Sequence, residues 1–327
     1  MVYQSLQYLL PRSGDAPRPA GRPTGRRWYG QLTTTGLTKY FNYSDMSLMR
    51  GETSKLSLWR VCAVLLAAMA LRSFVCAASE VPGARPRMRV DPNSEAAHVE
   101  LVRKARSGNI SLYFLGDSIT RRWGSADDQY RTLYENWMHN FFGWNAADFG
   151  WGGDTTENIL WRIGNGELDG VMPKAIVLLA GTNNLTSPDI PKMDDVRVNS
   201  VVDGVKAILS ACQAKAPGAT IVLIGVTPRN DDMSLMPLIR KINGKLAALA
   251  DGRRIRFLNI NRRLSDEHDR LRAGMVNPDG LHLAVKGYQV WADALRPVLA
   301  ELLGPRAARD SAPSPTRDPG IKGSEIH

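Results

Sequence analysis

Cysteine is scarce in this sequence: Cys62, Cys76 and Cys212 are the only three among 327 residues. The first two lie in an N-terminal segment with the features of a leader, so a processed chain would keep Cys212 alone, and one thiol forms no internal disulfide. Cys and His residues do not cluster at metal-ligand spacing, and H-E-x-x-H is absent. We therefore expect no disulfide scaffold, no metal-dependent mechanism and no cofactor.

Clusters of positive charge are missing from most of the chain. The formal net charge is +10, but residues 1–77 alone hold ten Lys or Arg against three Asp or Glu. Basic residues in the remaining part are scattered and do not alternate with aromatics. This pattern argues against a nucleic-acid-binding surface.

Long hydrophobic runs are also absent. The apolar run at residues 61–71 spans eleven residues, short of the roughly 20 that a transmembrane helix needs. Basic residues precede it and small residues follow it up to Ala77, which is the form of a secretory signal peptide over residues 49–77. We expect a secreted or periplasmic protein; the alternative is a membrane anchor formed by the same segment.

Composition sets the other boundaries. Residues 1–48 are rich in Pro, Gly and Arg, and are predicted to be disordered or a spurious extension of the chain. Residues 78–93 are predicted to be a Pro/Arg-rich linker, and residues 305–327 a disordered Pro/Ser/Arg-rich tail. Residues 94–304 remain as one folded domain.

Within that domain, apolar runs that end in glycine or polar turns alternate with segments of helical spacing. Strands are predicted at 110–115, 146–149, 175–180, 220–226 and 255–260. Helices are predicted at 94–107, 130–142, 154–163, 196–215, 235–250 and 284–303. This alternation predicts an α/β fold: a doubly wound sheet of about five parallel strands with helices on both faces.

The stretch at residues 110–124, ISLYFLGDSITRRWG, carries the first candidate site residue. Ser118 would lie at the carboxyl edge of the sheet, where open α/β sheets bind ligands. It would also lie near a helix N-terminus, where backbone N–H groups favour a developing oxyanion. Ser118 is therefore a candidate nucleophile; the alternative is a strand-to-helix turn with a capping residue.

A serine nucleophile needs a base, and histidine is the usual one. The sequence has five histidines: His98, His139, His268, His282 and His327. Only His282 lies in a compact polar turn, with Asp279 three residues before it and Gly280 between them. Asp279 can then accept a hydrogen bond from one imidazole nitrogen while the other faces Ser118. The alternative is a helix-capping aspartate beside a surface histidine.

Candidate donors for an oxyanion follow the next two strands. Gly153 would offer a backbone N–H, and Asn183 a side-chain amide. Each is common in turns and caps, so the argument rests on their order along the chain: Ser, then Gly, then Asn, then Asp-x-x-His before the last helix.

This order resembles the SGNH (GDSL-type) hydrolase family. The matching blocks are GDSIT at 116–120, FGWGGDTTENILWRI at 149–163, GTNN at 181–184 and DGLH at 279–282. Within the family, the second and third blocks look most like the platelet-activating-factor acetylhydrolase catalytic subunits and their bacterial relatives. Asn184 stands where other members have aspartate.

The resemblance implies a flavodoxin-like SGNH hydrolase domain and a role for each residue. Ser118 would be the nucleophile and would also donate its backbone N–H. Gly153 and Asn183 would complete the oxyanion hole. His282 would be the base, and Asp279 would orient it.

We therefore predict a serine esterase that hydrolyses short-chain carboxylic esters, acetyl esters in particular, through an acyl-enzyme. The expected partner is a small ester: an acetylated sugar, an aryl ester or a lipid ester. A carbohydrate O-deacetylase or a lysophospholipase on the same site is the alternative, and a non-catalytic binding module is a third hypothesis. The sequence leaves the oligomeric state open.

Overall fold

The computed structural model describes residues 83–320 of the chain. The predicted N-terminal extension (1–48), the predicted signal peptide (49–77), the first part of the predicted linker and residues 321–327 lie outside the described residues. Among the helices of residues 83–320, none has the length and apolar character needed to cross a membrane.

The centre of the described domain is a parallel sheet. Its strands are β1 (Leu112–Gly116), β2 (Ala146–Gly150), β3 (Ala175–Leu179), β4 (Thr220–Ile224) and β5 (Ile255–Leu258). Their spatial order is β2-β1-β3-β4-β5, and every neighbouring pair is parallel. This is the flavodoxin-like order, in which the direction of winding reverses between β1 and β3. The predicted sheet is confirmed.

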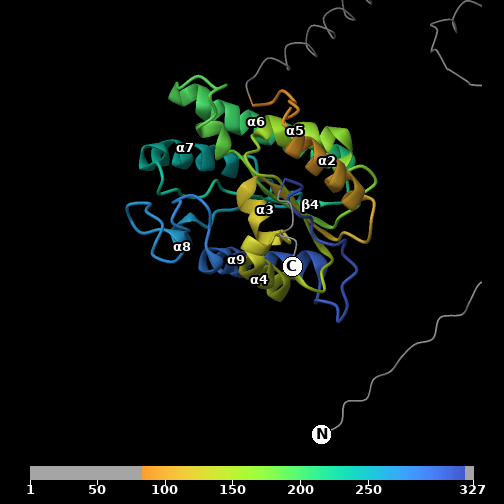
Figure 1. Cartoon of the computed structure of the whole chain (residues 1–327). Helices are drawn as coiled ribbons and strands as arrows, with labels where there is room; N and C mark the ends of the chain where they lie inside the picture. Colours follow the sequence, from red (N-terminus) through yellow and green to blue (C-terminus); the bar gives the residue numbers. More distant parts are fainter. Residues whose placement is uncertain (1–82, 321–327) are drawn as a thin grey trace, which may run out of the picture. The chain divides into compact units, whose positions relative to one another are not determined.

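Helices cover both faces of the sheet, as predicted (Figure 1). One face carries α2 (Pro92–Ala105), α5 (Thr156–Arg162), α6 (Asp194–Lys215) and α7 (Met236–Ala247). The other carries α3 (Ser118–Gly124), α4 (Arg131–Phe141), α8 (Asn261–Leu264) and α9 (Val285–Leu303). Short helical turns are η1 (Asp128–Tyr130), η2 (Ile163–Glu167), η3 (Asn183–Leu185) and η4 (Met233–Leu235).

The strands are buried on both faces because helices cover both. Successive β1 side chains alternate between two cores: Tyr113 lies on the α2 side and Phe114 on the α3 side. The α3 side is aromatic, with Trp123 of α3 packed 5.0 Å from Trp291 of α9 between ring centroids. Both indole rings are fully buried. This packing fixes α3, and with it Ser118 at its first position.

Residues 305–320, within the predicted tail, form hydrogen bonds with the rest of the described domain. The N–H of Ala307 donates to the carbonyl oxygen of Gly143 at 2.9 Å, and the carbonyl oxygen of Thr316 accepts from Ala126 at 3.2 Å. Asp310 Oδ2 accepts from the N–H groups of Gly143 and Asn145 at 2.7 and 3.2 Å. The tail lacks an apolar period, so its order comes from hydrogen bonds to distant loops, which composition does not reveal.

The predicted linker is likewise fixed to the domain from Gly83 onward. The carbonyl oxygen of Gly83 accepts from the Thr156 hydroxyl at 2.9 Å, and the N–H of Arg87 donates to the carbonyl oxygen of Glu157 at 3.0 Å. Asn158 Nδ2 donates to the carbonyl oxygen of Arg87 at 2.9 Å. Residues 83–91 therefore run along α5 before Asp91 caps α2.

Candidate active site

The ends of three strands align at one edge of the sheet. Gly116 at the end of β1 pairs with Gly150 in β2 and with Leu179 in β3. The loops that follow β1, β2 and β3 therefore leave the sheet side by side, although the sequence separates them widely. These loops carry Ser118, Gly153 and Asn183.

Ser118 is the first residue of α3, directly after β1. Asp117 caps this helix, because its carboxylate accepts from the N–H of Ile119 at 2.9 Å. Asp117 is fully buried, and burial raises the pKa of its carboxyl to about 7. The side chain of Ile119 is also fully buried. The turn therefore has little freedom, and the Ser118 hydroxyl is held at the edge.

The structure brings Ser118, His282 and Asp279 together from opposite ends of the domain. Ser118 Oγ lies 2.8 Å from His282 Nε2, and His282 Nδ1 lies 2.8 Å from Asp279 Oδ2. Because Nδ1 faces a carboxylate, it carries the proton, and Nε2 is left to accept from the serine hydroxyl. This is the arrangement of a nucleophile, a general base and the carboxylate that orients the base.

A tight turn builds the Asp279–His282 pair before α9. Asp279 Oδ1 accepts from the N–H groups of Leu281 and His282 at 3.0 and 2.9 Å, which leaves Oδ2 for the imidazole. Gly280 has a φ of +71°, and a Cβ on it would approach the nitrogen of Asp231 to 2.7 Å. Glycine is therefore required at this position.

The charges in this turn suit a neutral base. Burial would raise the pKa of Asp279, but hydrogen bonds from the His282 and Leu281 N–H groups and from the imidazole lower it to about 2. Burial lowers the pKa of His282 below its ordinary 6.5, and the nearby Arg122 guanidinium lowers it further against the opposing effect of Asp279. Asp279 is therefore ionised and His282 neutral at pH 7.

Asn183 is oriented by the loop that carries Gly153. Its Nδ2 donates to the carbonyl oxygen of Asp154 at 2.8 Å. An amide nitrogen has two N–H groups, so this bond fixes the plane of the amide and leaves the second N–H available. Asn184, the departure from the family pattern, is fully buried and bonds to Thr156 and Glu157. It joins the loop after β3 to α5.

The loop that carries Gly153 leads into α5. Thr155 is the N-cap of α5, and Asn158 Oδ1 accepts from the Thr155 N–H at 3.0 Å. Asp154 binds Arg162 Nε through Oδ2 at 2.7 Å. Both partners of that ion pair are buried. Burial raises the pKa of Asp154 to about 6 even though Arg162 lowers it.

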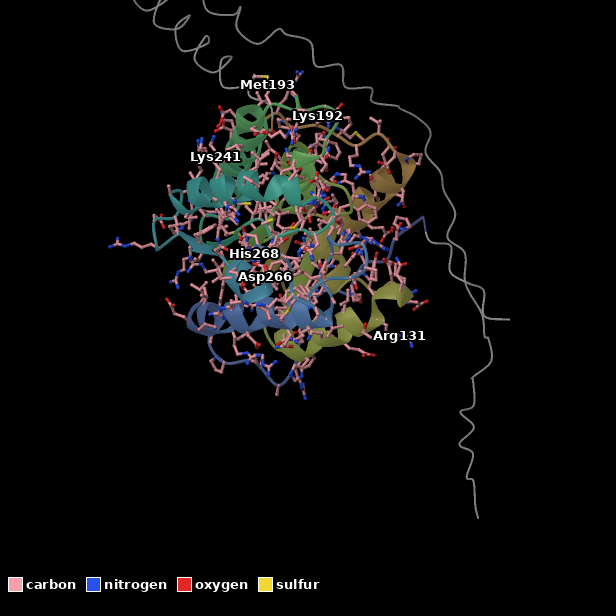
Figure 2. All side chains as sticks on the ribbon, turned by 90° about the vertical axis from the view of Figure 1, so that its left-hand side faces the viewer. Arg131, Lys192, Met193, Lys241, Asp266 and His268 are labelled. Carbon is pink, nitrogen blue, oxygen red and sulfur yellow. The ribbon has the colours of Figure 1, made fainter. Side chains whose placement is uncertain are left out.

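Three further histidines have other surroundings. His98 Nδ1 lies 2.8 Å from Glu167 on the α2 side of the sheet. The carbonyl oxygen of His139 accepts from Arg306 at 2.6 Å. His268 is exposed on the surface beside Asp266, in the loop that faces the viewer in Figure 2. His327 lies outside the described residues.

Two arginines near the site were not predicted from the sequence. Arg122 Nη1 lies 3.2 Å from Asp279 Oδ2, the oxygen that also faces His282. Arg122 lies four residues after Ser118, which places both on one face of α3. This spacing could have predicted that Arg122 lies near the site. Arg89 Nη1 donates to the carbonyl oxygen of Gly152 at 2.5 Å. Nothing near Arg89 in the sequence indicates this contact.

A cleft of about 650 Å³ opens beside Gly153 and Asn183. Residues 87–91 form one wall, and residues 186–189 form another. Thr155 and Asn158 also line it, and the wall at residues 87–91 adds the apolar side chains of Met88 and Val90. Within residues 83–320, no three His, Cys, Asp or Glu side chains are grouped to hold a metal ion.

Comparison with known proteins adds evidence that is independent of this geometry. The model of the GDSL-like lipase/acylhydrolase family matches residues 114–290. Bovine platelet-activating factor acetylhydrolase IB subunit alpha1 is 29% identical over 256 residues, which cover 73% of this chain and 98% of the relative. The human alpha2 subunit is 29% identical over 233 residues, which cover 68% of this chain and 90% of the relative.

Two solved structures share the fold. A putative platelet activating factor from Streptococcus pneumonia has a TM-score of 0.51 at 21% identity, and the match covers 72% of this chain and 99% of that one. A putative acylhydrolase from Bacteroides fragilis has a TM-score of 0.50 at 19% identity, covering 66% and 100%.

Proposed function

The chain belongs to the GDSL-like lipase/acylhydrolase family and is a carboxylic ester hydrolase. We propose that it cleaves short-chain esters, acetyl esters in particular, through an acyl-enzyme on Ser118. The observation that carries this proposal is the continuous contact from Ser118 Oγ through His282 to Asp279, at 2.8 Å for each step.

The first half of the reaction forms the acyl-enzyme. Ser118 Oγ attacks the ester carbonyl carbon while His282 Nε2 takes its proton, and Asp279 stabilises the imidazolium. The carbonyl oxygen becomes an oxyanion, for which the N–H groups of Ser118 and Gly153 and the free N–H of Asn183 are the donors. The intermediate collapses, the C–O bond to the leaving group breaks, and His282 returns the proton to the departing alcohol.

The second half regenerates the enzyme. His282 takes a proton from water as the water oxygen attacks the acyl carbon, and the same donors hold the second oxyanion. Collapse breaks the bond to Ser118 Oγ, which recovers its proton from His282. The products are a carboxylic acid and an alcohol.

Two observations support small acyl groups. The similar curated proteins carry the name acetylhydrolase. The connections after β1 and β2 are short, with one residue between β1 and α3 and residues 151–155 between β2 and α5. Neither of these two turns is long enough to cover a long acyl chain.

A carbohydrate O-deacetylase is the second candidate. Polar side chains line part of the cleft beside Gly153 and Asn183, Thr155 and Asn158 among them, and these suit a hydroxylated leaving group. Higher kcat/KM on acetylated xylan than on aryl acetates or lyso-lipids would favour it.

The test is hydrolysis of p-nitrophenyl esters from acetate to octanoate by wild type, Ser118→Ala and Ser210→Ala. Ser210 is an exposed serine on α6 and serves as the control. We expect the highest kcat/KM on acetate, loss of turnover in Ser118→Ala alone, and fluorophosphonate labelling of wild type but not Ser118→Ala. Full activity in Ser118→Ala would overturn the assignment, and a wild-type chain that neither turns over esters nor labels would be a binding module.

We also propose export through residues 49–77, on the strength of their sequence pattern alone. N-terminal sequencing of the mature protein should find a start near Ala78. Recovery of the full-length chain with the membrane fraction would favour the anchor instead.

A further inference from the structure

The segment before α2 contacts the loop that carries one oxyanion donor, and we propose that Arg89 is a positioning residue for the Gly153 N–H. This inference rests on the esterase proposed above. It concerns a residue that would not touch the substrate's reacting atoms but would set the direction of a group that does.

The contact is between a guanidinium and one peptide group. Arg89 Nη1 donates to the carbonyl oxygen of Gly152 at 2.5 Å. The N–H of Gly153 belongs to the same peptide group as this carbonyl. Because a trans peptide is planar and its C=O and N–H point in opposite directions, a bond that holds the carbonyl also fixes the N–H.

The peptide needs to be held because its two residues are glycines. The N–H of Asp154 donates to the carbonyl oxygen of Trp151 at 3.4 Å, which closes a turn with Gly152 and Gly153 at its centre. Gly153 has a φ of +78°, the value of the third residue of a type II turn. The alternative type I turn differs chiefly by a flip of this central peptide, and glycine resists the flip least. A flipped peptide would aim the carbonyl where the N–H now points.

The guanidinium is itself fixed from two other sides. Asp91 Oδ2 accepts from Arg89 Nε at 3.1 Å, and Asp91 is the cap of α2. Arg89 Nη1 also lies 3.7 Å from Oδ1 of buried Asp154, an oxygen that accepts no hydrogen bond from the described residues. The Arg89 guanidinium therefore offsets the charge of the buried Asp154 carboxylate and also holds the turn. A charged donor on the carbonyl further polarises the peptide and strengthens its N–H as a donor.

The test compares Arg89→Met, Arg89→Lys and the matched control Arg85→Met on p-nitrophenyl acetate, a neutral substrate that removes any steering by charge. Arg85 lies in the same segment and is exposed. Each kcat is expressed per Ser118 that a fluorophosphonate titrates to completion, so that unfolded protein does not contribute. We expect Arg89→Met to lower kcat roughly ten- to hundredfold with KM within about twofold. Arg89→Lys should recover part of the loss, and Arg85→Met should match wild type.

The outcomes separate this inference from the esterase itself. An active wild type with unchanged kcat in Arg89→Met would overturn the positioning role alone. A higher KM at constant kcat would also overturn it, because Arg89 would then bind substrate. An equal loss in Arg89→Lys and Arg89→Met would show that packing rather than the charged donor matters. Absence of both turnover and labelling in wild type would overturn the esterase and this inference together.

Discussion

At the scale of the residue, Asp279 faces an imidazole and a guanidinium through one oxygen. Oδ2 lies 2.8 Å from His282 Nδ1 and 3.2 Å from Arg122 Nη1. The carboxylate stabilises imidazolium, whereas the guanidinium disfavours it, and burial disfavours it most. The pKa of the base is therefore set by a balance that includes a residue outside the triad.

The pH dependence of kcat/KM should reflect that balance. His282 must be neutral to accept the serine proton, so activity should fall as the pH drops through its lowered pKa, below 6.5. Replacing Arg122 with Gln removes a cation, which raises the pKa of His282 and moves the acid limb to higher pH. Arg122→Lys should leave the limb near the wild-type position, as should Arg131→Gln on the exposed start of α4 (Figure 2). An acid limb unchanged in Arg122→Gln would contradict this assignment.

Asn183 makes a second prediction at this scale. In Asn183→Ala, loss of one oxyanion donor should lower kcat by roughly 10²–10³ while the protein stays folded. Asn199→Ala, on the exposed side of α6, is the matched control. Steady-state kinetics with a circular dichroism melt would check both points. A kcat within a few-fold of wild type would show that Asn183 donates only to Asp154.

At the scale of the element, Arg162 of α5 joins the ends of two strands. Its guanidinium donates to the carbonyl oxygens of Gly116 and Phe149 at 3.2 and 3.0 Å, and it pairs with Asp154 and Glu167, which are fully buried. Buried carboxylates are costly unless they are paired. The loops after β1 and β2 therefore depend on one side chain beneath them.

Arg162→Met should leave these carboxylates without the cation that contacts both of them. We expect the free energy of unfolding to fall by about 3–5 kcal/mol. Arg103→Met, which breaks an exposed pair with Glu100 on α2, should cost no more than about 1 kcal/mol. Urea denaturation followed by tryptophan fluorescence would measure both. Equal small losses in the two variants would mean that the buried cluster adds little to stability.

At the scale of the whole described domain, its two terminal segments are part of the fold. Residues 83–91 run along α5 to the cleft. Asp310, residues 312–315 and the start of β2, an edge strand, line one cavity of about 240 Å³. Edge strands pair readily with other chains unless something covers them. The tail residues therefore lie where they can protect β2.

Truncation after Gly304 tests this role. Loss of the hydrogen bonds to Gly143, Asn145 and Ala126 should lower the free energy of unfolding by roughly 1–3 kcal/mol. This net value allows for the entropy cost of ordering the tail, which the truncated chain no longer has. Light scattering on heating should rise at a lower temperature than in wild type. Asp310→Ala should show a smaller shift in the same direction. A truncated protein that melts and scatters like wild type would exclude a protective role.

The sheet, its two helical layers and the order of the four blocks could be predicted from the sequence, because buried strands and amphipathic helices impose local periods that can be read directly. The sequence also singled out Ser118, Gly153, Asn183, Asp279 and His282, because each follows a strand or precedes the last helix in a polar turn. The partners that act across the chain emerge only from packing in three dimensions: Arg122 on Asp279, Arg162 beneath two strand ends, Arg89 on the Gly152 carbonyl and Asp310 of the tail on Gly143 and Asn145. Those contacts join segments whose sequences carry no period or spacing in common, and three-dimensional packing alone brings them within hydrogen-bond distance.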